Sequence, residues 1–580
     1  MATRAGKKQR AATAAADAAA PSDDRVSCLF DDVAPLLLPL LPLDERARAA
    51  GVSRAWRAAA SEPALWAELD FLRCAARVTD AKLAALCARA GPALRALNLA
   101  MKSCKRVSNN GLIAALRDGG CTGVQRISKG CVESGGASRQ RFESTPALVL
   151  QLAAACPQLA LMPCTISCES FLEAAFAAAA LPGPLALHIE GDSTSDREEG
   201  VLPMMLRRSV TRVSMRDCSL APTEITALAG ALRLNSTLTS LTFFEVDGIN
   251  AAAVTALGEA LRVNGALETL YLHYNSIGSV GAAALGQTLL VNSTLKSLIV
   301  AENTIGEGGA VALGEALRVN RTLTSLNLRD NGIGGDGLTA LSEALHTNNM
   351  LTELDLGEND SGLVGLAALC DALRLNSTLT KLSLCDNGID GDGMDMLSDA
   401  LCQTRALKSL NLAKNGFDDR GAVAVGEALH SNSSLTELNL STNEIGAEGA
   451  VELGKALCVN STLTSLNLCG NPIGDTGAVW LGEGLRVSSG ALAVLLLEGC
   501  TIEDSGAAAL SMALRGNSTL RQLGLDHNRI HYLGADALAE ALQVNRTLKV
   551  ISLASNRIGA SGLIALRKAA RANASLTLEV

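Results

Sequence analysis

Asparagine recurs every 28 residues through much of this chain, and this period restricts the possible folds more than any other feature. The asparagines in phase are Asn275, Asn303, Asn331, Asn359, Asn387, Asn415, Asn443 and Asn471, and Asn528 and Asn556 resume the period after one slip. A fixed period of this length predicts a solenoid. Because each repeat of a solenoid contacts only its neighbours, such folds present long binding surfaces.

The phrase around each asparagine predicts one short strand and one helix per repeat. In the copy from Leu323 to Gly337, alternate leucines mark a strand with one buried face. Glycines that tolerate a tight turn follow, and then a helix with apolar residues at helical spacing, Ala310 to Leu317 in the preceding copy. The pattern predicts an α/β fold, a right-handed solenoid with a concave parallel sheet and convex helices.

The asparagine position itself is expected to be a buried turn. Its side chain can bond to backbone groups that the bend leaves open. Cys218, Asp247 and Cys500 hold this place in three repeats. Other glycines in phase, Gly332-x-Gly334-x-x-Gly337, resemble a dinucleotide fingerprint, but their regular recurrence favours a structural turn.

Composition narrows the class of protein further. Hydrophobic residues make up 48% of the chain but aromatic residues only 2%, so the core must consist of leucine, alanine, isoleucine and valine. The net charge of -9, without a dense basic stripe, disfavours nucleic acid as a partner. Sixteen cysteines without paired spacing indicate a reducing compartment. No signal peptide or membrane span is expected, and the predicted location is cytoplasmic, nuclear or both.

We divide the chain into four parts. Residues 1–25 are predicted to form a disordered, Ala-rich, basic tail, and residues 26–71 a small, all-helical module. Residues 72–205 contain divergent repeats, with strands expected at Leu97 to Leu99, Leu159 to Leu161 and Leu185 to Ile189, and with loops at 119–145 and 191–200. Residues 206–580 contain the regular repeats.

No catalytic, cofactor-binding or metal-binding constellation is found, so we expect no enzyme activity and no cofactor. The six histidines have no carboxylate or thiol partner at motif spacing. His346 and His430 are expected at helix ends, where the helix dipole favours them. His527 and His531 are expected to flank a turn rather than bind zinc.

Asn-x-Ser/Thr sequences recur in the chain and could indicate glycosylation. Their asparagines are Asn235, Asn292, Asn320, Asn376, Asn432, Asn460, Asn517, Asn545 and Asn573. Each follows a predicted helix, where asparagine readily adopts the left-handed capping conformation. We therefore interpret them as caps.

One group of concave positions departs from the serines and asparagines of the other repeats. Exposed aromatic residues on a rigid sheet are typical anchors of a protein interface. A mostly acidic strip runs beside them, which predicts a partner with basic character. The hypothetical partner-binding residues are Phe244, Glu245, Tyr271, His273, Tyr274, Glu302, Arg329, Asp330, Glu353 and Asp355, with Glu358 next to them. The alternative is that Phe244 and Tyr271 fill irregular packing near Asp247.

Residues 206–580 resemble leucine-rich repeats of the ribonuclease-inhibitor class. The resemblance rests on about a dozen copies of the Leu-x-x-Leu-x-Leu-x-x-Asn phrase. It implies a horseshoe that binds proteins. A scaffold or regulator similar to ribonuclease inhibitor or to the repeats of innate-immune receptors is one function this resemblance allows. A GTPase-activating protein of the Ran type is another.

The module at 26–71 resembles an F-box. The matching segments are Leu41-Pro42-Leu43-Asp44, Val52-Ser53-Arg54-Ala55-Trp56-Arg57 and Pro63-Ala64-Leu65-Trp66. The resemblance implies docking onto a Skp-type adaptor and cullin of a ubiquitin ligase, with the repeats binding a protein substrate. The adaptor-binding residues that it implies are Leu41, Pro42, Leu43, Val52, Trp56, Leu65 and Trp66.

Overall fold

The computed structural model describes most of the regular repeats and shorter segments before them. The described residues are 68–70, 80–94, 96–100, 109–118, 121, 126–130, 164–168, 185–190, 210–487, 491–573 and 575–580. The chain divides into two compact units, and strands β4 (Cys164–Cys168) and β5 (Leu185–Glu190) contain residues of both. Unit 1 comprises Met1–Ser167 and Phe176–Leu185, and unit 2 comprises Cys168–Ala175 and Ala186–Val580.

Unit 1 contains a short parallel sheet with helices between its strands. Its elements are β1 (Glu68–Asp70), α5 (Asp80–Ala90), the 3-10 helix η4 (Gly91–Ala93), β2 (Ala96–Ala100), α6 (Asn109–Asp118) and β3 (Arg126–Gly130). β2 pairs with both β1 and β3. The prediction that residues 26–71 are helical is therefore wrong at β1, which lies at the end of that range. The strands predicted at Leu97 to Leu99 and Leu185 to Ile189 are confirmed as β2 and β5. The prediction of a loop over 119–145 is wrong at β3, and the candidate strand at Leu159 to Leu161 lies outside the described residues.

Unit 2 alternates strands and helices in a single order. The strands are β6 (Val210–Ser219), β7 (Ser240–Asp247), β8 (Thr269–Tyr271), β9 (Ser297–Ile299), β10 (Ser325–Asn327), β11 (Glu353–Asp355), β12 (Lys381–Ser383), β13 (Ser409–Asn411), β14 (Glu437–Asn439), β15 (Ser465–Asn467), β16 (Val494–Leu496), β17 (Gln522–Gly524), β18 (Val550–Ser552) and β19 (Thr577–Glu579). Neighbouring strands pair in parallel, with Leu298, Leu326 and Leu354 in register.

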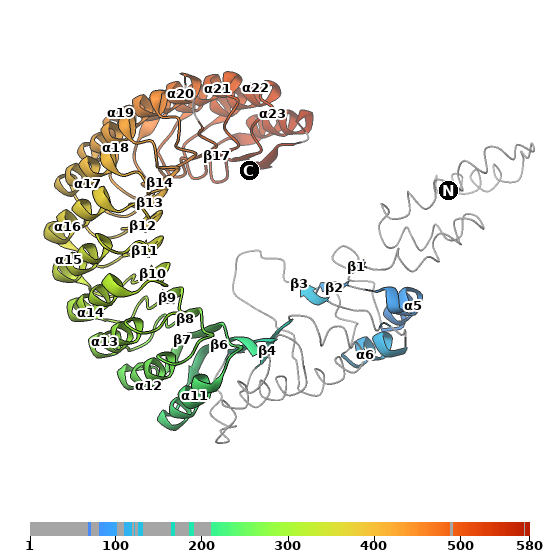
Figure 1. Ribbon diagram of the computed structural model, residues 1–580. Coiled ribbons are helices and arrows are strands. Elements are labelled where there is room, and N and C mark those ends of the chain that lie inside the picture. The colour runs from blue at the N-terminus through green and yellow to red at the C-terminus, as the bar shows by residue number, and fades with distance from the viewer. Residues whose placement is uncertain are drawn as a thin grey trace, which may run out of the picture. The chain divides into compact units, whose positions relative to one another are not determined.

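A helix follows each of these strands except β19. The helices are α11 (Pro222–Leu234), α12 (Ala251–Leu261), α13 (Gly278–Leu289), α14 (Gly306–Val319), α15 (Gly334–Leu345), α16 (Gly362–Leu375), α17 (Gly391–Gln403), α18 (Asp419–Ser431), α19 (Ala447–Val459), α20 (Gly474–Val487), α21 (Asp504–Gly516), α22 (Tyr532–Val544) and α23 (Gly559–Ala572). Within unit 2 the helices lie along the outer side of an arc and the strands along its inner side (Figure 1). The predicted α/β solenoid is confirmed.

The core of each repeat lies between its strand and its helix. Leu326 and Leu328 from the strand side and Leu313 and Leu317 from a helix are almost completely buried. Burying a leucine side chain contributes about 1.5–3 kcal/mol relative to leaving it exposed. Since every repeat has the same thickness, leucine and alanine suffice to fill this layer.

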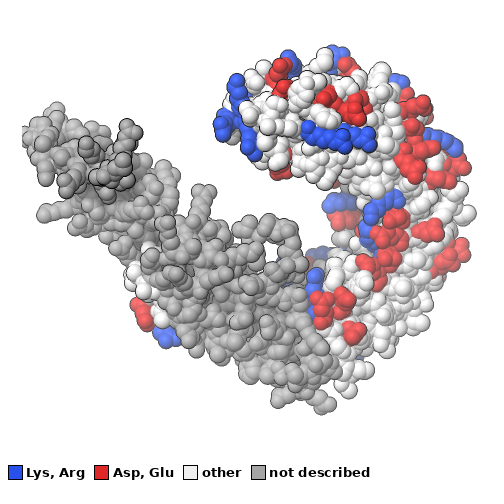
Figure 2. Space-filling view, turned by 180° about the vertical axis from the view of Figure 1, so that it is seen from behind, with Lys and Arg blue, Asp and Glu red and all other residues white. Residues whose placement is uncertain are grey.

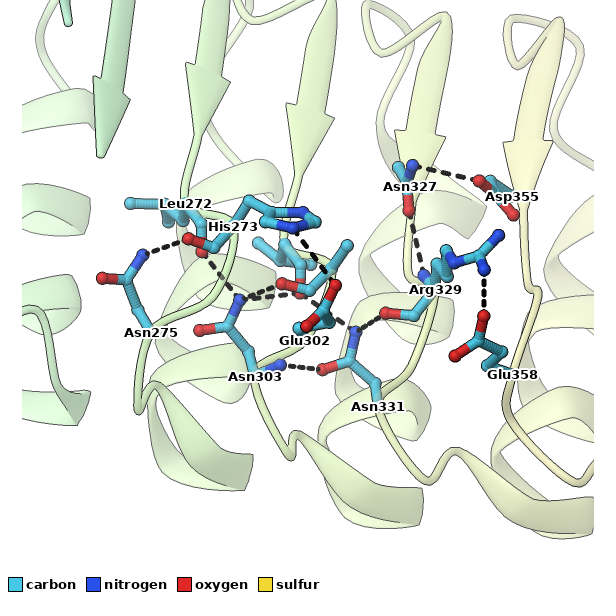
Figure 3. A network of polar contacts seen from close by, with 12 residues as sticks. Leu272, His273, Asn275, Glu302, Asn303, Asn327, Arg329, Asn331, Asp355 and Glu358 are labelled. Atoms are coloured by element: carbon cyan, nitrogen blue, oxygen red, sulfur yellow. Dashed lines mark hydrogen bonds and ion pairs between the residues drawn. The ribbon is translucent and has the colours of Figure 1, made fainter. Parts of the chain in front are cut away.

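The in-phase asparagines form a ladder along unit 2, as the sequence predicts. Asn331 Nδ2 donates to the backbone oxygens of Val300, Leu328 and Arg329, each at 3.0 Å. Its Oδ1 accepts from the backbone N of Asn303 at 3.0 Å (Figure 3). The same contact between successive asparagines continues without a break from Asn303 to Asn471.

The assignment of Asp247 to the asparagine place is wrong by one residue. Val246, which is buried, occupies that place: it is in register with Cys218, and its backbone N donates to Asn275 Oδ1 at 3.0 Å. Asp247 is exposed. Cys500 does occupy the place, and burial raises the pKa of its thiol to about 12. The neutral thiol donates to the backbone oxygen of Leu468 at 3.2 Å.

The asparagines of the Asn-x-Ser/Thr sequences form a second buried row. The prediction of a left-handed conformation is wrong, because the residue is extended, with φ -64° and ψ 134° at Asn320. Its Oδ1 accepts from the backbone N of Leu323 at 2.8 Å, and its Nδ2 donates to the backbone oxygen of Leu289 at 2.8 Å. Asn320 therefore ends its own helix and ties it to the previous repeat.

Candidate protein-binding surface

Four rings from two neighbouring repeats gather on the strand side of unit 2. Phe244 lies in β7, Tyr271 lies in β8, and His273 and Tyr274 follow β8 directly. The ring centroids of Phe244 and His273 are 5.0 Å apart with 10° between the planes. His273 is 5.7 Å from Tyr271 and 6.3 Å from Tyr274. We call Phe244, Tyr271, His273 and Tyr274 the aromatic patch.

A cation contacts one end of this stack of rings, and a carboxylate contacts the other end. The Arg216 guanidinium lies over the Phe244 ring, with Cζ 4.1 Å from the centroid, a cation–π contact. At the other end His273 Nε2 lies 3.2 Å from Glu302 Oε1, as Figure 3 shows. The stack fixes the orientation of Phe244 and His273 before any partner arrives, which lowers the cost of binding.

The two tyrosines of the aromatic patch remain accessible. Tyr274 is 50% exposed and Tyr271 is half-buried. Partial burial raises the pKa of the Tyr271 phenol, an effect that Arg216 opposes and Glu302 strengthens. The hydroxyl of Tyr271 therefore keeps its proton at neutral pH and can donate a hydrogen bond.

The acidic strip is more strongly neutralised within the chain than the sequence suggests. Arg329 forms an ion pair with Glu358, and Glu353 Oε1 lies 2.7 Å from Lys381 Nζ. Asp355 accepts from Asn327 Nδ2 at 3.1 Å (Figure 3). It also accepts from the backbone N of Gly357 at 3.1 Å. On the face shown in Figure 2, acidic and basic groups alternate along unit 2.

Three exposed carboxylates on the strand side of unit 2 lie at one recurrent turn position. Asp217, Glu245 and Asp330 have positive φ angles of 51°, 52° and 50°, as does Tyr274 at 59°. All three carboxylates are exposed, and none forms an ion pair with another described residue. They supply the negative charge that is available to a partner.

Sequence reasoning missed Arg216, which lies in β6, one strand before the residues that the sequence singled out. Arg216 is in register with Phe244 on the neighbouring strand, so the repeat alignment could have revealed it. The partner-binding residues that the sequence predicts all lie in or shortly after strands β7 to β11, but they form two groups. The aromatic patch with Glu245 and Glu302 is one, and Arg329, Asp330, Glu353 and Asp355 are the other.

The residues that the F-box resemblance implies all lie outside the described residues. They are Leu41, Pro42, Leu43, Val52, Trp56, Leu65 and Trp66. Within the described residues no group of three potential metal ligands is found, and no helix there could cross a membrane. His346 caps α15, and His430 lies in the last turn of α18, which confirms their predicted positions.

The glycines that resemble a dinucleotide loop have structural roles. Gly334 has a φ of 64°, which favours glycine. A Cβ atom at Gly337 would lie 2.6 Å from the Ile333 side chain and 2.8 Å from that of Ala310. The third glycine therefore lets α15 pack closely against its neighbours.

Comparison with known proteins identifies the repeat type. The family described as "Leucine Rich repeat" matches residues 291–314, 319–342, 347–370, 375–398, 405–426, 431–454, 459–481, 516–539 and 544–566. Unit 2 thus contains nine matched leucine-rich repeats, a type of repeat that serves as a protein-interaction scaffold. No F-box family matches the chain, and no curated protein matches it.

Among solved structures, 194 chains match. One is "Leiomodin-1 Actin-Binding Site 2 (ABS2)", which is 32% identical over 18% of this chain, with a TM-score of 0.18. The match covers 62% of that chain, less than two thirds of its length. At this TM-score the likeness supports no conclusion about fold or function.

Proposed function

We propose that unit 2 is the recognition domain of a non-enzymatic protein and that the aromatic patch is the centre of its binding surface. The stacked rings carry the proposal. They are accessible, held by neighbouring strands, and supported at both ends by Arg216 and Glu302. Aromatic residues in rigid, partly buried settings contribute most of the binding free energy in many interfaces.

The chemistry of the surroundings defines the kind of partner. The rings offer apolar edges, and the tyrosine hydroxyls offer hydrogen bonds. The exposed carboxylates Asp217, Glu245 and Asp330 favour a partner segment that carries lysine or arginine next to an apolar residue. The second group, Arg329 with Glu353 and Asp355, would lie at the rim of the binding surface. Paired charges there add little to the affinity for a partner.

Replacing Tyr271 and Tyr274 together by alanine is expected to weaken partner binding at least about tenfold, or about 1.4 kcal/mol. Affinity isolation of the tagged full-length protein, with bound proteins quantified by mass spectrometry, would measure the loss. Tyr532→Ala is the matched control, because Tyr532 is 52% exposed, like Tyr274, but lies on helix α22. Equal recovery of every partner by the double variant and the control would contradict the proposal.

We also propose that the protein is the substrate-recognition subunit of a Skp–cullin–F-box ubiquitin ligase. The order and spacing of the F-box-like residues between Leu41 and Trp66, placed ahead of leucine-rich repeats, support this function. The module would dock on the adaptor, and the aromatic patch would hold the substrate. Two alternative functions would also use unit 2 but would not involve adaptor binding. One is a scaffold similar to ribonuclease inhibitor or innate-immune receptors, and the other is a Ran-type GTPase activator.

Deleting residues 26–71 is expected to abolish co-purification with a Skp-type adaptor, because the deletion removes every proposed adaptor contact. Deleting residues 1–25 is the control and should leave adaptor binding intact. Co-expression and size-exclusion chromatography would report both. If the full chain does not bind the adaptor, or the deleted chain still does, the ligase function is excluded. A GTP-hydrolysis assay with Ran then tests the other candidate.

A further inference from the structure

One turn of unit 2 has a serine where the other described repeats have a large apolar residue. The corresponding residues, all buried, are Leu220, Ile249, Ile277, Ile305, Ile333, Ile389, Phe417, Ile445, Ile473, Ile502, Ile530 and Ile558. In the repeat of α16 this position is Ser361. Its side chain is buried too, and its Oγ donates to Asn387 Oδ1 at 2.9 Å, so it joins the asparagine ladder.

The missing apolar side chain leaves a hollow. A cavity of about 80 Å³ lies beside Ser361, with apolar walls formed by Leu338, Leu366, Leu384 and Ile389. Several of its lining residues are exposed, among them Leu363, Gly388 and Asp390, so the hollow reaches the surface. The other lining residues include Asp360, Asn387 and Asp390, so the hollow has apolar walls and polar groups around them.

Apolar residues are exposed beside the hollow. Leu363 is 47% exposed and Val364 is 76% exposed, at the start of α16. The equivalent residues at the start of α14 are Glu307 and Gly308, neither of which is a large apolar residue. The repeat of α13 has an exposed Val280 at the position of Val364, but there an isoleucine fills the turn. Among the described repeats, only that of α16 combines an exposed apolar pair with an unfilled turn.

The rim of the hollow is negatively charged. Asp360 lines the hollow, and Asp386 precedes the lining residue Asn387; both are exposed, with positive φ angles of 47° and 55°. Asp390 is exposed and accepts from the backbone N of Gly393 at 3.0 Å. None of the three forms an ion pair with another described residue, whereas nearby Asp392 and Asp395 both pair with Arg420.

We propose that the hollow beside Ser361 is a second docking site, which takes one isoleucine or leucine side chain of a protein segment with arginine or lysine on either side. The aliphatic side chain would fill the space that Ser361 leaves, and Leu363 and Val364 would cover it. The basic residues would face Asp360, Asp386 and Asp390. This site uses none of the residues of the aromatic patch, so the two can be tested separately.

The test uses a short capped peptide with one isoleucine between two arginines and full-length protein with ¹³C-labelled methyl groups. Titration is expected to shift the methyl signals of Leu363 and Leu384. Ser361→Ile fills the hollow from within and should weaken binding at least about tenfold, as should replacing the peptide isoleucine by alanine. Because Ser361→Ile fills a cavity, it should not lower the melting temperature.

Val364→Asp provides a second test at the surface, with Val280→Asp as the matched control at the equivalent position of α13. Only Val364→Asp should alter binding of the peptide. Unchanged affinity in Ser361→Ile, or equal binding of the alanine peptide, would show attraction by charge alone and would overturn the proposal. The Tyr271→Ala, Tyr274→Ala double variant should keep full peptide binding, which separates a failure here from a failure of the aromatic patch.

Discussion

Replacing Asn331 by alanine is expected to destabilise unit 2 by about 3–5 kcal/mol, because several buried backbone groups lose their partner at once. Asn331 is 2% exposed. Its amide group satisfies three backbone oxygens and accepts from the backbone N of Asn303 and of Ile305, the latter at 3.4 Å. Each such group left unsatisfied in a buried site costs about 1–3 kcal/mol.

Urea unfolding would measure the loss of stability, and hydrogen exchange would locate it. Because each repeat contacts only its neighbours, the amides of Asn303 and Ile305 should exchange much faster while those of distant β17 change little. Asn327→Ala is the control. Asn327 is half-buried; its Nδ2 donates to Asp355 and its Oδ1 accepts from the backbone N of Arg329, and water can replace both contacts. Equal destabilisation by the two variants would show that the ladder has no special structural role.

The 28-residue period predicted the fold because each repeat uses the same buried positions. Leu326 and its counterparts repeat in register, and no long-range information is needed to align them. The misplacement of Asp247 arose because one residue is inserted in this repeat. Since Leu241 pairs with Leu270 rather than with a residue 28 positions away, counting from Asn275 pointed to Asp247 instead of Val246. Only the strand register shows where the insertion lies.

The sequence could predict which residues belong to the candidate site, but not the contacts that they form. The period placed Phe244 and His273 in adjacent repeats, but only the strand register, which is offset by the inserted residue, shows that they occupy equivalent places. Whether Arg329 is available to a partner or engaged by Glu358 depends on rotamers, which the period does not determine. The hollow beside Ser361 was also visible in principle, as a polar residue at an otherwise apolar position, but its volume depends on how far the neighbouring side chains relax.

Replacing Gly454 by leucine is expected to destabilise unit 2 by about 3 kcal/mol, at the upper end of the cost of overpacking. Gly454 lies within α19, and a Cβ atom there would be 2.5 Å from the backbone oxygen and 2.6 Å from the backbone carbon of Trp480 in α20. Rotation of a side chain cannot relieve a clash with backbone atoms. The two helices must separate, which exposes the leucines between them.

Gly230→Leu is the matched control for this prediction and should change stability in the opposite direction. Gly230 lies within α11, and a Cβ atom there would meet nothing within 4 Å. Removing glycine from an open helical position stabilises a helix by about 0.5–1 kcal/mol. Thermal unfolding of both variants therefore separates helix propensity from close packing. If Gly454→Leu also raised the melting temperature, the helices of unit 2 would not be held at the spacing that glycine allows.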